Sequence, residues 1–315
     1  MNVRKDEFQI DESQSLIDFL INNLSFINSE QDCNKLISEK RILVNEKIIS
    51  ENINLVEKDV VCILTPQEFE PKINSDFEII YQDEFLFAVN KPAPLPVHPA
   101  GKYYFNTLTN LLKEKIYVEN LDIKEFYPVN RLDRETTGIV LFAKTKEIAA
   151  KLGNLFERKE INKKYVAVCF GKIIEKHFVI DKPLLKTNFE EFRNHVVVDE
   201  KGKPSTTIVN LIKSNNKFSL VEINLLTGRS HQIRVHLASV GFPIVGDKEY
   251  GKYPYIFIKF NKNEISENEI VEKLLTRHQL LHCEEISFVH PISNKKLIIC
   301  AKMPEDMKIF INENF

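Results

Sequence analysis

The chain of 315 residues is 43% hydrophobic and 28% charged, which suits about two globular domains and excludes a disordered chain. No apolar run approaches the roughly 20 residues that span a membrane, and the N-terminus lacks the apolar stretch of a signal peptide, so we expect a cytoplasmic protein. The net charge of −2 neither indicates nor excludes a polyanionic partner.

The first 66 residues have the pattern of a small helix–helix–hairpin domain. Apolar residues recur at helical spacing in two segments, and short strand-like runs follow. Prolines and acids over residues 67–76 are typical of a linker. The predicted elements are two helices, a hairpin with a tight turn and a further strand, at residues 13–28, 31–39, 42–49 and 60–64.

Residues 77–315 are expected to form one larger domain. Short apolar strands are interrupted at uneven intervals by helical patterns, which indicates an α+β fold rather than a regular βαβ repeat. Gly241 is well placed to end the last predicted helix. Strands are predicted at residues 77–81, 85–89, 139–143, 165–170 and 218–225, and helices at residues 107–115, 146–158 and 230–240.

Charge is unevenly distributed along the chain. Residues 1–70 carry 7 lysines and arginines against 14 acids, a net charge of −7. The other 245 residues carry 36 against 31, a net charge of +5. A phosphate backbone could therefore bind to the larger part, whereas the N-terminal domain should repel phosphates.

Residues 129–145 form the most informative segment. Arg131 and Asp133 lie two apart in a polar loop, and a Thr-Thr-Gly turn leads from there into the apolar strand of residues 139–143. A carboxylate and a guanidinium at the mouth of a buried strand are typical of a rigid reactive site. Taken alone, the pair also suits a surface salt bridge beside a hairpin.

Residues 226–251 form a second dense motif. Gly228 frees the backbone just before the predicted helix, so Arg229 should lie near the N-terminus of that helix. One function for Arg229 is to pair with a buried carboxylate and hold it ionised. The alternatives are a phosphate contact or a surface charge.

Tyr165 begins a predicted strand directly after two lysines and shares one face of it with Ala167 and Cys169. The plain interpretation is core packing with the hydroxyl group at the rim. The alternative is a ring that stacks on a planar base. The pattern around this tyrosine leaves both interpretations open.

No metal site is predicted. His231 and His236 are five residues apart and should diverge on a helix, while His278 and His282 are four apart but have no evident third ligand. The five cysteines are scattered without any Cys-x-x-Cys pair, which indicates reduced thiols.

Four blocks of this sequence, in the same order, resemble the RluA-type pseudouridine synthases. The resemblance covers about residues 77–304, and residues 13–64 more loosely resemble the small alpha-L RNA-binding domain that often precedes the catalytic domain. The matching family features are the His-Arg-Leu-Asp-x-x-Thr-Ser-Gly signature, the Asn-Lys-Pro loop, the Thr-Gly-Arg-x-His-Gln-Ile-Arg-Val-His block and the closing segment, at residues 130–138, 90–99, 226–251 and 277–291.

The resemblance implies a function and a fold. These enzymes isomerise uridine in RNA to pseudouridine without a cofactor or a metal, on ribosomal (23S) or transfer RNA. The implied catalytic domain is a mixed, largely antiparallel sheet with flanking helices and a central cleft. We expect a monomer with RNA as its partner; its acidic N-terminal domain should bind RNA weakly, and contact the catalytic domain or a protein instead.

The resemblance also implies roles for individual residues. Asp133 corresponds to the essential carboxylate, which must be ionised whether it attacks the ribose or removes a ribose proton. Arg229 corresponds to the arginine paired with that aspartate, and Tyr165 to a tyrosine that stacks on the target base. Arg131 corresponds to an arginine that fills the gap left by a flipped nucleotide. Further contacts to phosphate or to the scaffold are expected from Lys91, His231 and Arg234.

The sequence departs from the family pattern at several positions. Asn130 replaces a histidine and Thr137 a serine, both with polarity kept, and Pro94 stiffens a loop where glycine is common. Residues 252–276 form a longer insertion than expected, and its purpose does not follow from the sequence.

Two other classes of function are alternatives. A non-catalytic RNA-binding homologue would not need the intact Asp133, Tyr165 and Arg229. A hydrolase that uses Asp133 as nucleophile would call for a second carboxylate, and Glu135 alone lies close in sequence.

Overall fold

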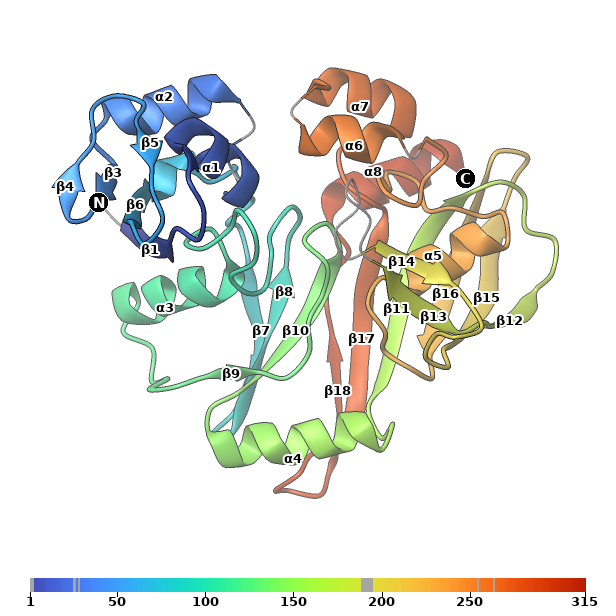
Figure 1. Ribbon diagram of the computed structural model, residues 1–315. Helices are drawn as coiled ribbons and strands as arrows, with labels where there is room; N and C mark the ends of the chain where they lie inside the picture. Colours follow the sequence, from blue (N-terminus) through green and yellow to red (C-terminus); the bar gives the residue numbers. More distant parts are fainter. Residues whose placement is uncertain (1–2, 25–26, 28, 188–194, 254, 263) are drawn as a thin grey trace. The chain divides into compact units, whose positions relative to one another are not determined.

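A computed structural model describes residues 3–24, 27, 29–187, 195–253, 255–262 and 264–315 (Figure 1). The chain divides into two compact units, one of residues 1–73 and 96–119, the other of residues 74–95 and 120–315. Helices are mixed with largely antiparallel strands, which confirms the predicted α+β class. No helix among the described residues is long and apolar enough to cross a membrane.

The first unit contains a four-stranded antiparallel sheet of order β1-β6-β3-β4. Helices α1 and α2 are capped by Ser15 and Ser29, whose hydroxyl groups accept a hydrogen bond from the third helical amide. The elements are β1 Val3–Gln9, β2 Gln14–Ser15, α1 Leu16–Asn23, α2 Glu30–Ser38, β3 Ile42–Val44, β4 Lys47–Ile48, β5 Asn54–Leu55, β6 Val60–Pro66, the 3-10 helix Gln67–Phe69 and α3 Leu108–Val118.

Most predicted elements of this unit are confirmed. Both helices, the hairpin and the strand are present, and Asn45 and Glu46 form the tight turn with φ values of 48° and 67°. The first helix is shorter than predicted because Leu24 is already extended, and residues 25, 26 and 28 lie outside the described residues. Strand β1 was missed because its inward positions are only half-buried and carry charged side chains as well as apolar ones.

The second unit contains a ten-stranded sheet. Its order is β12-β15-β16-β11-β17-β10-β8-β7, with β18 beside β17 and β9 beside β10. All pairs are antiparallel except β10 with β17. The strands are β7 Glu78–Gln82, β8 Leu86–Lys91, β9 Tyr127–Pro128, β10 Thr137–Ala143, β11 Asn162–Phe170, β12 His177–Asp181, β15 Thr206–Ser214, β16 Phe218–Leu225, β17 Leu281–Val289 and β18 Lys296–Cys300.

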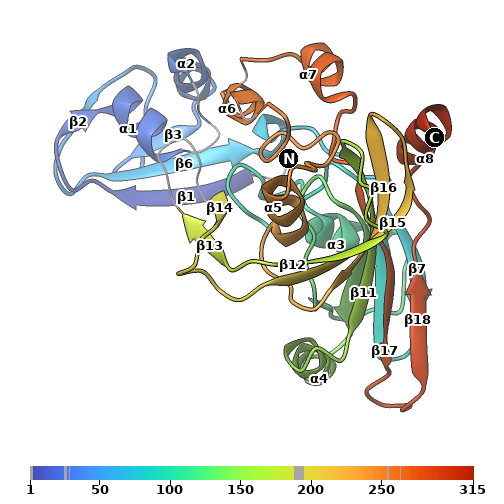
Figure 2. The same ribbon diagram turned by 90° about the vertical axis from the view of Figure 1, so that its right-hand side faces the viewer.

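Five helices and a separate hairpin complete this unit among the described residues. They are α4 Lys146–Glu157, α5 Gln232–Ser239, α6 Tyr255–Asn261, α7 Glu267–Leu274, α8 Glu305–Asn314 and the hairpin of β13 Leu184–Thr187 with β14 His195–Val198. Gly241 ends α5 with φ +88°, as predicted. Figure 2 shows α5 and α6 on the same side of the sheet.

The middle of this sheet brings the two principal motifs together. All seven residues of β10 are buried, and β17 separates β10 from β11. Gly138 of β10 has φ +109° and lies so close to Cys283 of β17 that a Cβ atom would overlap the Cys283 carbonyl, so the position requires glycine. The polar loop before β10 therefore reaches the sheet directly beside β17 and β11.

Candidate active site

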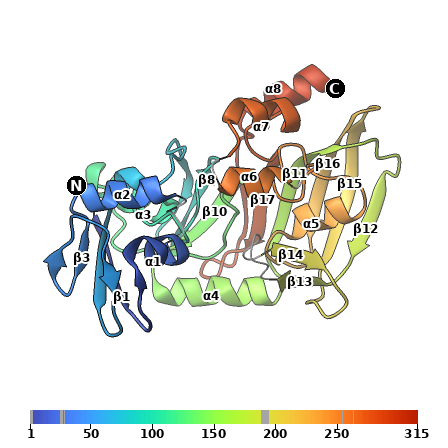
Figure 3. The ribbon, with the colours of Figure 1, turned by 45° about the horizontal axis from the view of Figure 1, so that its top comes forward.

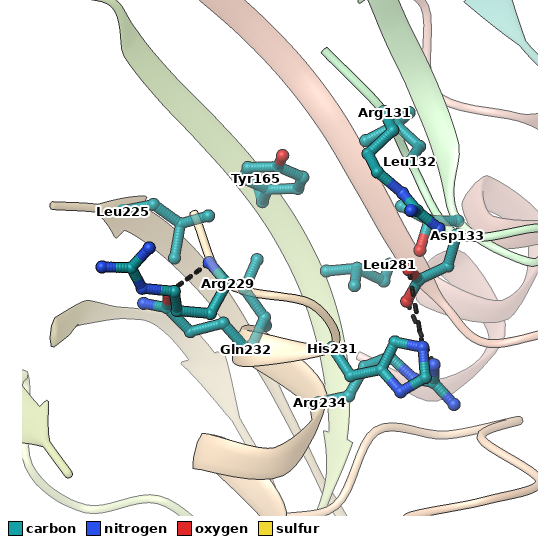
Figure 4. Close-up of a pocket in the computed structure, with 12 residues that line it drawn as sticks. Arg131, Leu132, Asp133, Tyr165, Leu225, Arg229, His231, Gln232, Arg234 and Leu281 are labelled. Atoms are coloured by element: carbon teal, nitrogen blue, oxygen red, sulfur yellow. Dashed lines mark hydrogen bonds and ion pairs between the residues drawn. The ribbon is translucent and has the colours of Figure 1, made fainter. Parts of the chain in front are cut away.

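A pocket forms where distant segments of the second unit meet (Figure 4). The loop before β10 contributes Asp133, β11 contributes Tyr165 and α5 contributes Arg234. They meet because β10, β17, β11 and β16 are consecutive in the sheet. The pocket is lined by Arg131, Leu132, Asp133, Thr136, Tyr165, Leu225, Arg229, His231, Gln232, Ile233, Arg234 and Leu281.

Asp133 is paired with Arg234. The Nη1 atom of Arg234 donates to Asp133 Oδ2 at 3.0 Å, and its Nε and Nη2 atoms donate to the two oxygens of Asp247 at 2.7 and 2.9 Å. The Nη2 atom also reaches Glu249 Oε2 at 3.2 Å. Because the buried guanidinium is held by three carboxylates from two segments, it presents a fixed positive charge to Asp133.

This environment keeps the Asp133 carboxylate ionised. Burial alone would raise its pKa, but the charges of His231 and Arg234 more than offset burial and lower the pKa below 3.8. The His231 Nε2 atom lies 3.9 Å from Asp133 Oδ1, yet burial lowers the pKa of this imidazole too. At neutral pH the permanent cations beside Asp133 are therefore Arg234, which forms the hydrogen bond, and Arg131.

The predicted ion pair between Arg229 and Asp133 is wrong. Both residues line the pocket, but the Arg229 side chain points away from Asp133 (Figure 4). His231, with φ 53°, turns the chain into α5, so that Arg229 stays in the preceding loop while Arg234 on the helix faces the carboxylate. The backbone amide of Arg229 donates to Gln232 Oε1 at 3.0 Å, which secures this turn.

Lys91 supports the loop that carries Asp133. Its side chain is fully buried, and Nζ donates to the carbonyl oxygens of Pro92, Leu95 and Arg134 at 2.9, 2.8 and 3.2 Å. Burial lowers the pKa of this lysine to about 7. Of the two roles left open for Lys91, the contacts match the scaffold and not a phosphate contact.

Glu135 forms a second ion network outside the pocket lining. Its carboxylate accepts from Lys248 Nζ at 2.7 Å and from Arg134 Nη2 at 2.6 Å. Burial would raise its pKa, but these two cations lower it to about 2. Because Glu135 does not line the pocket that contains Asp133, it is not placed to serve as the second carboxylate of a hydrolase.

Replacing Glu135 with glutamine is expected to destabilise the fold. The pKa of Glu135 falls from an ordinary 4.5 to about 2 on folding, which is worth about 3 kcal/mol above pH 4.5. This contribution is lost as the pH drops through about 2. Urea denaturation should therefore show a smaller difference in the free energy of unfolding between Glu135→Gln and wild type at pH 3 than at pH 7. Glu147→Gln, which removes an exposed pair with Lys151, should have much less effect.

Tyr165 and Arg131 occupy different parts of the pocket. Tyr165 is 6% exposed, and burial together with its contacts to Cys283 raises its pKa well above 10, so the phenol stays neutral. Arg131 is exposed beside Asp133 (Figure 4). The buried ring and the solvent-facing guanidinium thus flank the carboxylate.

The remaining histidines have structural partners. His282 Nδ1 lies 2.9 Å from Thr137 Oγ1 and its Nε2 atom 3.2 Å from the Ala301 carbonyl, whereas His278 pairs with Asp306. In the parts of the chain that the structure describes, no group of histidine, cysteine and acidic side chains is arranged to hold a metal. Sequence reasoning missed the roles of Asp247 and Glu249, although both lie in the second motif.

Known proteins similar to this chain share one activity in their names. A family model described as RNA pseudouridylate synthase matches residues 85–239. Ribosomal large subunit pseudouridine synthase C of Buchnera aphidicola subsp. Baizongia pistaciae is 35% identical over 85% of this chain and 84% of its own length. The mitochondrial tRNA pseudouridine(32) synthase of Saccharomyces cerevisiae is 33% identical over 75% of this chain and 50% of its own length. The solved structure of human RNA pseudouridylate synthase domain containing 4 is 25% identical, covers 74% of this chain and 91% of that chain, and has a TM-score of 0.57.

Proposed function

Because this chain belongs to the RNA pseudouridine synthase family, we propose that Asp133 is the catalytic carboxylate with which it isomerises uridines of large-subunit ribosomal RNA. The observation that carries this proposal is an ionised Asp133, held by Arg234 in a pocket with Tyr165. The choice of RNA is supported by a relative that matches over most of both chains.

The reaction moves one glycosidic bond and adds no atoms. The bond between ribose C1′ and N1 of uracil breaks, a bond between C1′ and C5 forms, C5 loses its proton and N1 gains one. Asp133 acts on the ribose in its ionised form, as nucleophile at C1′ or as base at a ribose carbon. Since no electrons enter or leave, the chemistry calls for no redox partner.

Tyr165 is proposed to stack on the displaced uracil and to exchange a proton with it. Its neutral hydroxyl lies close enough to Asp133 for the carboxylate charge to raise the phenol pKa. Tyr165→Phe is therefore expected to keep the stacking surface and to lower kcat by about 10²-fold, with RNA affinity within about twofold of wild type. If the single-turnover rate constant of Tyr165→Phe equals that of wild type, only the stacking role is left.

Arg131 and His231 are the proposed RNA contacts at the pocket rim. The target nucleotide must leave its stack before ribose and base can enter the pocket, and the exposed Arg131 guanidinium is suited to the space left behind. Arg234 and Lys91 instead act through Asp133 and its loop.

We further propose a cytoplasmic monomer, since RNA is the substrate and the described pocket is lined within one unit. Residues 1–66 are proposed as an accessory domain, residues 67–76 as its linker and residues 77–315 as the catalytic domain. The net charge of −7 over residues 1–70 supports a weak role of the accessory domain in RNA binding.

Incubation with total RNA from a strain that lacks the gene tests the function. Pseudouridines are then mapped chemically at nucleotide resolution, and we expect wild-type protein to restore sites in large-subunit ribosomal RNA. Restoration only in transfer RNA contradicts the proposed substrate. Binding without modification contradicts catalysis, and release of free uracil indicates hydrolysis.

A further inference from the structure

The insertion of residues 252–276 folds as a helical hairpin with a core of its own. Ile256 of α6 and Ile270 and Leu274 of α7 are buried together, and Tyr253, Phe260 and Ile265 pack against them. Ser266 begins α7 with a capping box to Glu269. Such packing holds the outer face of α6 in a defined position.

Phe260 joins this hairpin to the catalytic loop. The centre of its ring lies 5.1 Å from the guanidinium carbon of Arg134 and 5.1 Å from Lys248 Nζ. Arg134 directly follows Asp133, and Lys248 is bound to Glu135. The insertion is therefore anchored on the residues next to the catalytic carboxylate, and Figure 3 shows α6 near α5, which carries Arg234.

The outer side of α6 is basic and aromatic. Tyr255 and Lys259 of α6 and Lys262 just after the helix follow at helical spacing and are exposed, as is Lys252 just before it. Tyr255 is 43% exposed, and the centre of its ring lies 6.1 Å from that of Tyr253. The name α6 face is used below for Lys252, Tyr253, Tyr255, Lys259 and Lys262.

The lysines of the α6 face are available to an anion. Residues 250–262 contain no acid, and none of these three lysines forms an ion pair within the described part of the chain. Lys252 and Lys259 lie 5.5 and 5.9 Å from the ring centres of Tyr253 and Tyr255. Hydrogen bonds from Ser266 and, to a lesser extent, the charge of Lys259 lower the pKa of Glu269. The Glu269 Oε2 atom accepts its hydrogen bonds from Ser266.

We propose that the α6 face binds single-stranded RNA that flanks the target uridine. An unstacked base lies on Tyr255, and the lysines contact the neighbouring phosphates. An exposed ring beside lysines that form no ion pair is suited to single-stranded nucleic acid, since a duplex offers no free base face. The inference rests on the proposed function, because it assigns the α6 face to the same RNA strand whose target uridine enters the pocket beside Asp133.

Fluorescence anisotropy with a labelled U12 oligonucleotide tests this inference on the full-length protein. Wild type should bind U12 more tightly than the A12·U12 duplex. Tyr255→Ala should raise the Kd for U12 at least about fivefold, whereas Tyr255→Phe, which keeps the ring, should stay within about twofold. Log K falls with log salt, and Lys259→Ala should make this slope shallower by about 0.7. The matched change Lys273→Ala on α7 should leave the slope unaltered.

Activity separates this inference from the proposed function. With RNA from the deletion strain, Tyr255→Ala should raise KM and leave kcat near the wild-type value. If wild type forms pseudouridine but Tyr255→Ala alters neither the U12 Kd nor KM, the inference fails alone. The inference also fails if wild type binds U12 and the duplex equally tightly, or binds neither. If wild type forms no pseudouridine in any RNA, the proposed function fails.

Discussion

Asp133→Asn is expected to lower the single-turnover rate of pseudouridine formation by at least about 10³-fold. Asparagine keeps the size of the side chain and one hydrogen-bond acceptor for Arg234, but it supplies neither a nucleophile nor a base. Arg234 also keeps its bonds to Asp247, so the fold should persist. The rate is followed as tritium released from RNA labelled at uracil C5.

Two comparisons make this result specific. Asp122→Asn, which changes an exposed aspartate of the same unit, should leave the rate unaltered. The affinity of Asp133→Asn for RNA should stay within about twofold of wild type, because the carboxylate contributes to the reaction and not to attraction of phosphates. A rate within tenfold of wild type would show that another group does the chemistry.

Arg234→Ala is expected to damage both activity and stability. It leaves Asp133, Asp247 and Glu249 without their shared cation, and breaking a buried pair in this way costs about 3–5 kcal/mol of unfolding free energy. Burial then raises the pKa of Asp133, so the acid limb of the pH–rate profile should move upward and kcat at neutral pH should fall by about 10²-fold.

Arg229→Ala is the matched control, since it removes the same side chain from the same pocket. We expect its unfolding free energy to stay within about 0.5 kcal/mol of wild type and its pH–rate profile to keep the wild-type acid limb. If Arg229→Ala shifted that limb and Arg234→Ala did not, the assignment of Arg234 as the partner of Asp133 would be wrong.

The sequence predicted the elements whose pattern is local. The buried strand β10 and the amphipathic helices α1, α2 and α4 follow from apolar periodicity, and Gly241 correctly marked the end of α5. Strands β12 to β15 were missed because each contains only one or two buried residues, so their apolar pattern is weak.

Two arginines of one motif show where sequence reasoning fails at the site. Arg229 and Arg234 are five residues apart, and which of them meets Asp133 depends on the left-handed conformation of His231 at the start of α5. No residue type at position 231 signals that turn. The partner of Asp133 therefore follows only from the backbone path, whereas Asp133 and Tyr165 were singled out by the resemblance of their motifs to those of the family.

The pKa of the Asp133 carboxyl group tests the account most directly. It can be measured by carbon-13 NMR on protein labelled at aspartate Cγ, with the signal assigned by its absence from Asp133→Asn. We expect the wild-type signal to keep its carboxylate shift at every pH above about 4.5, and the Arg234→Ala signal to titrate at a higher pH. A wild-type midpoint between pH 5 and 8 would contradict a carboxylate held ionised by Arg234.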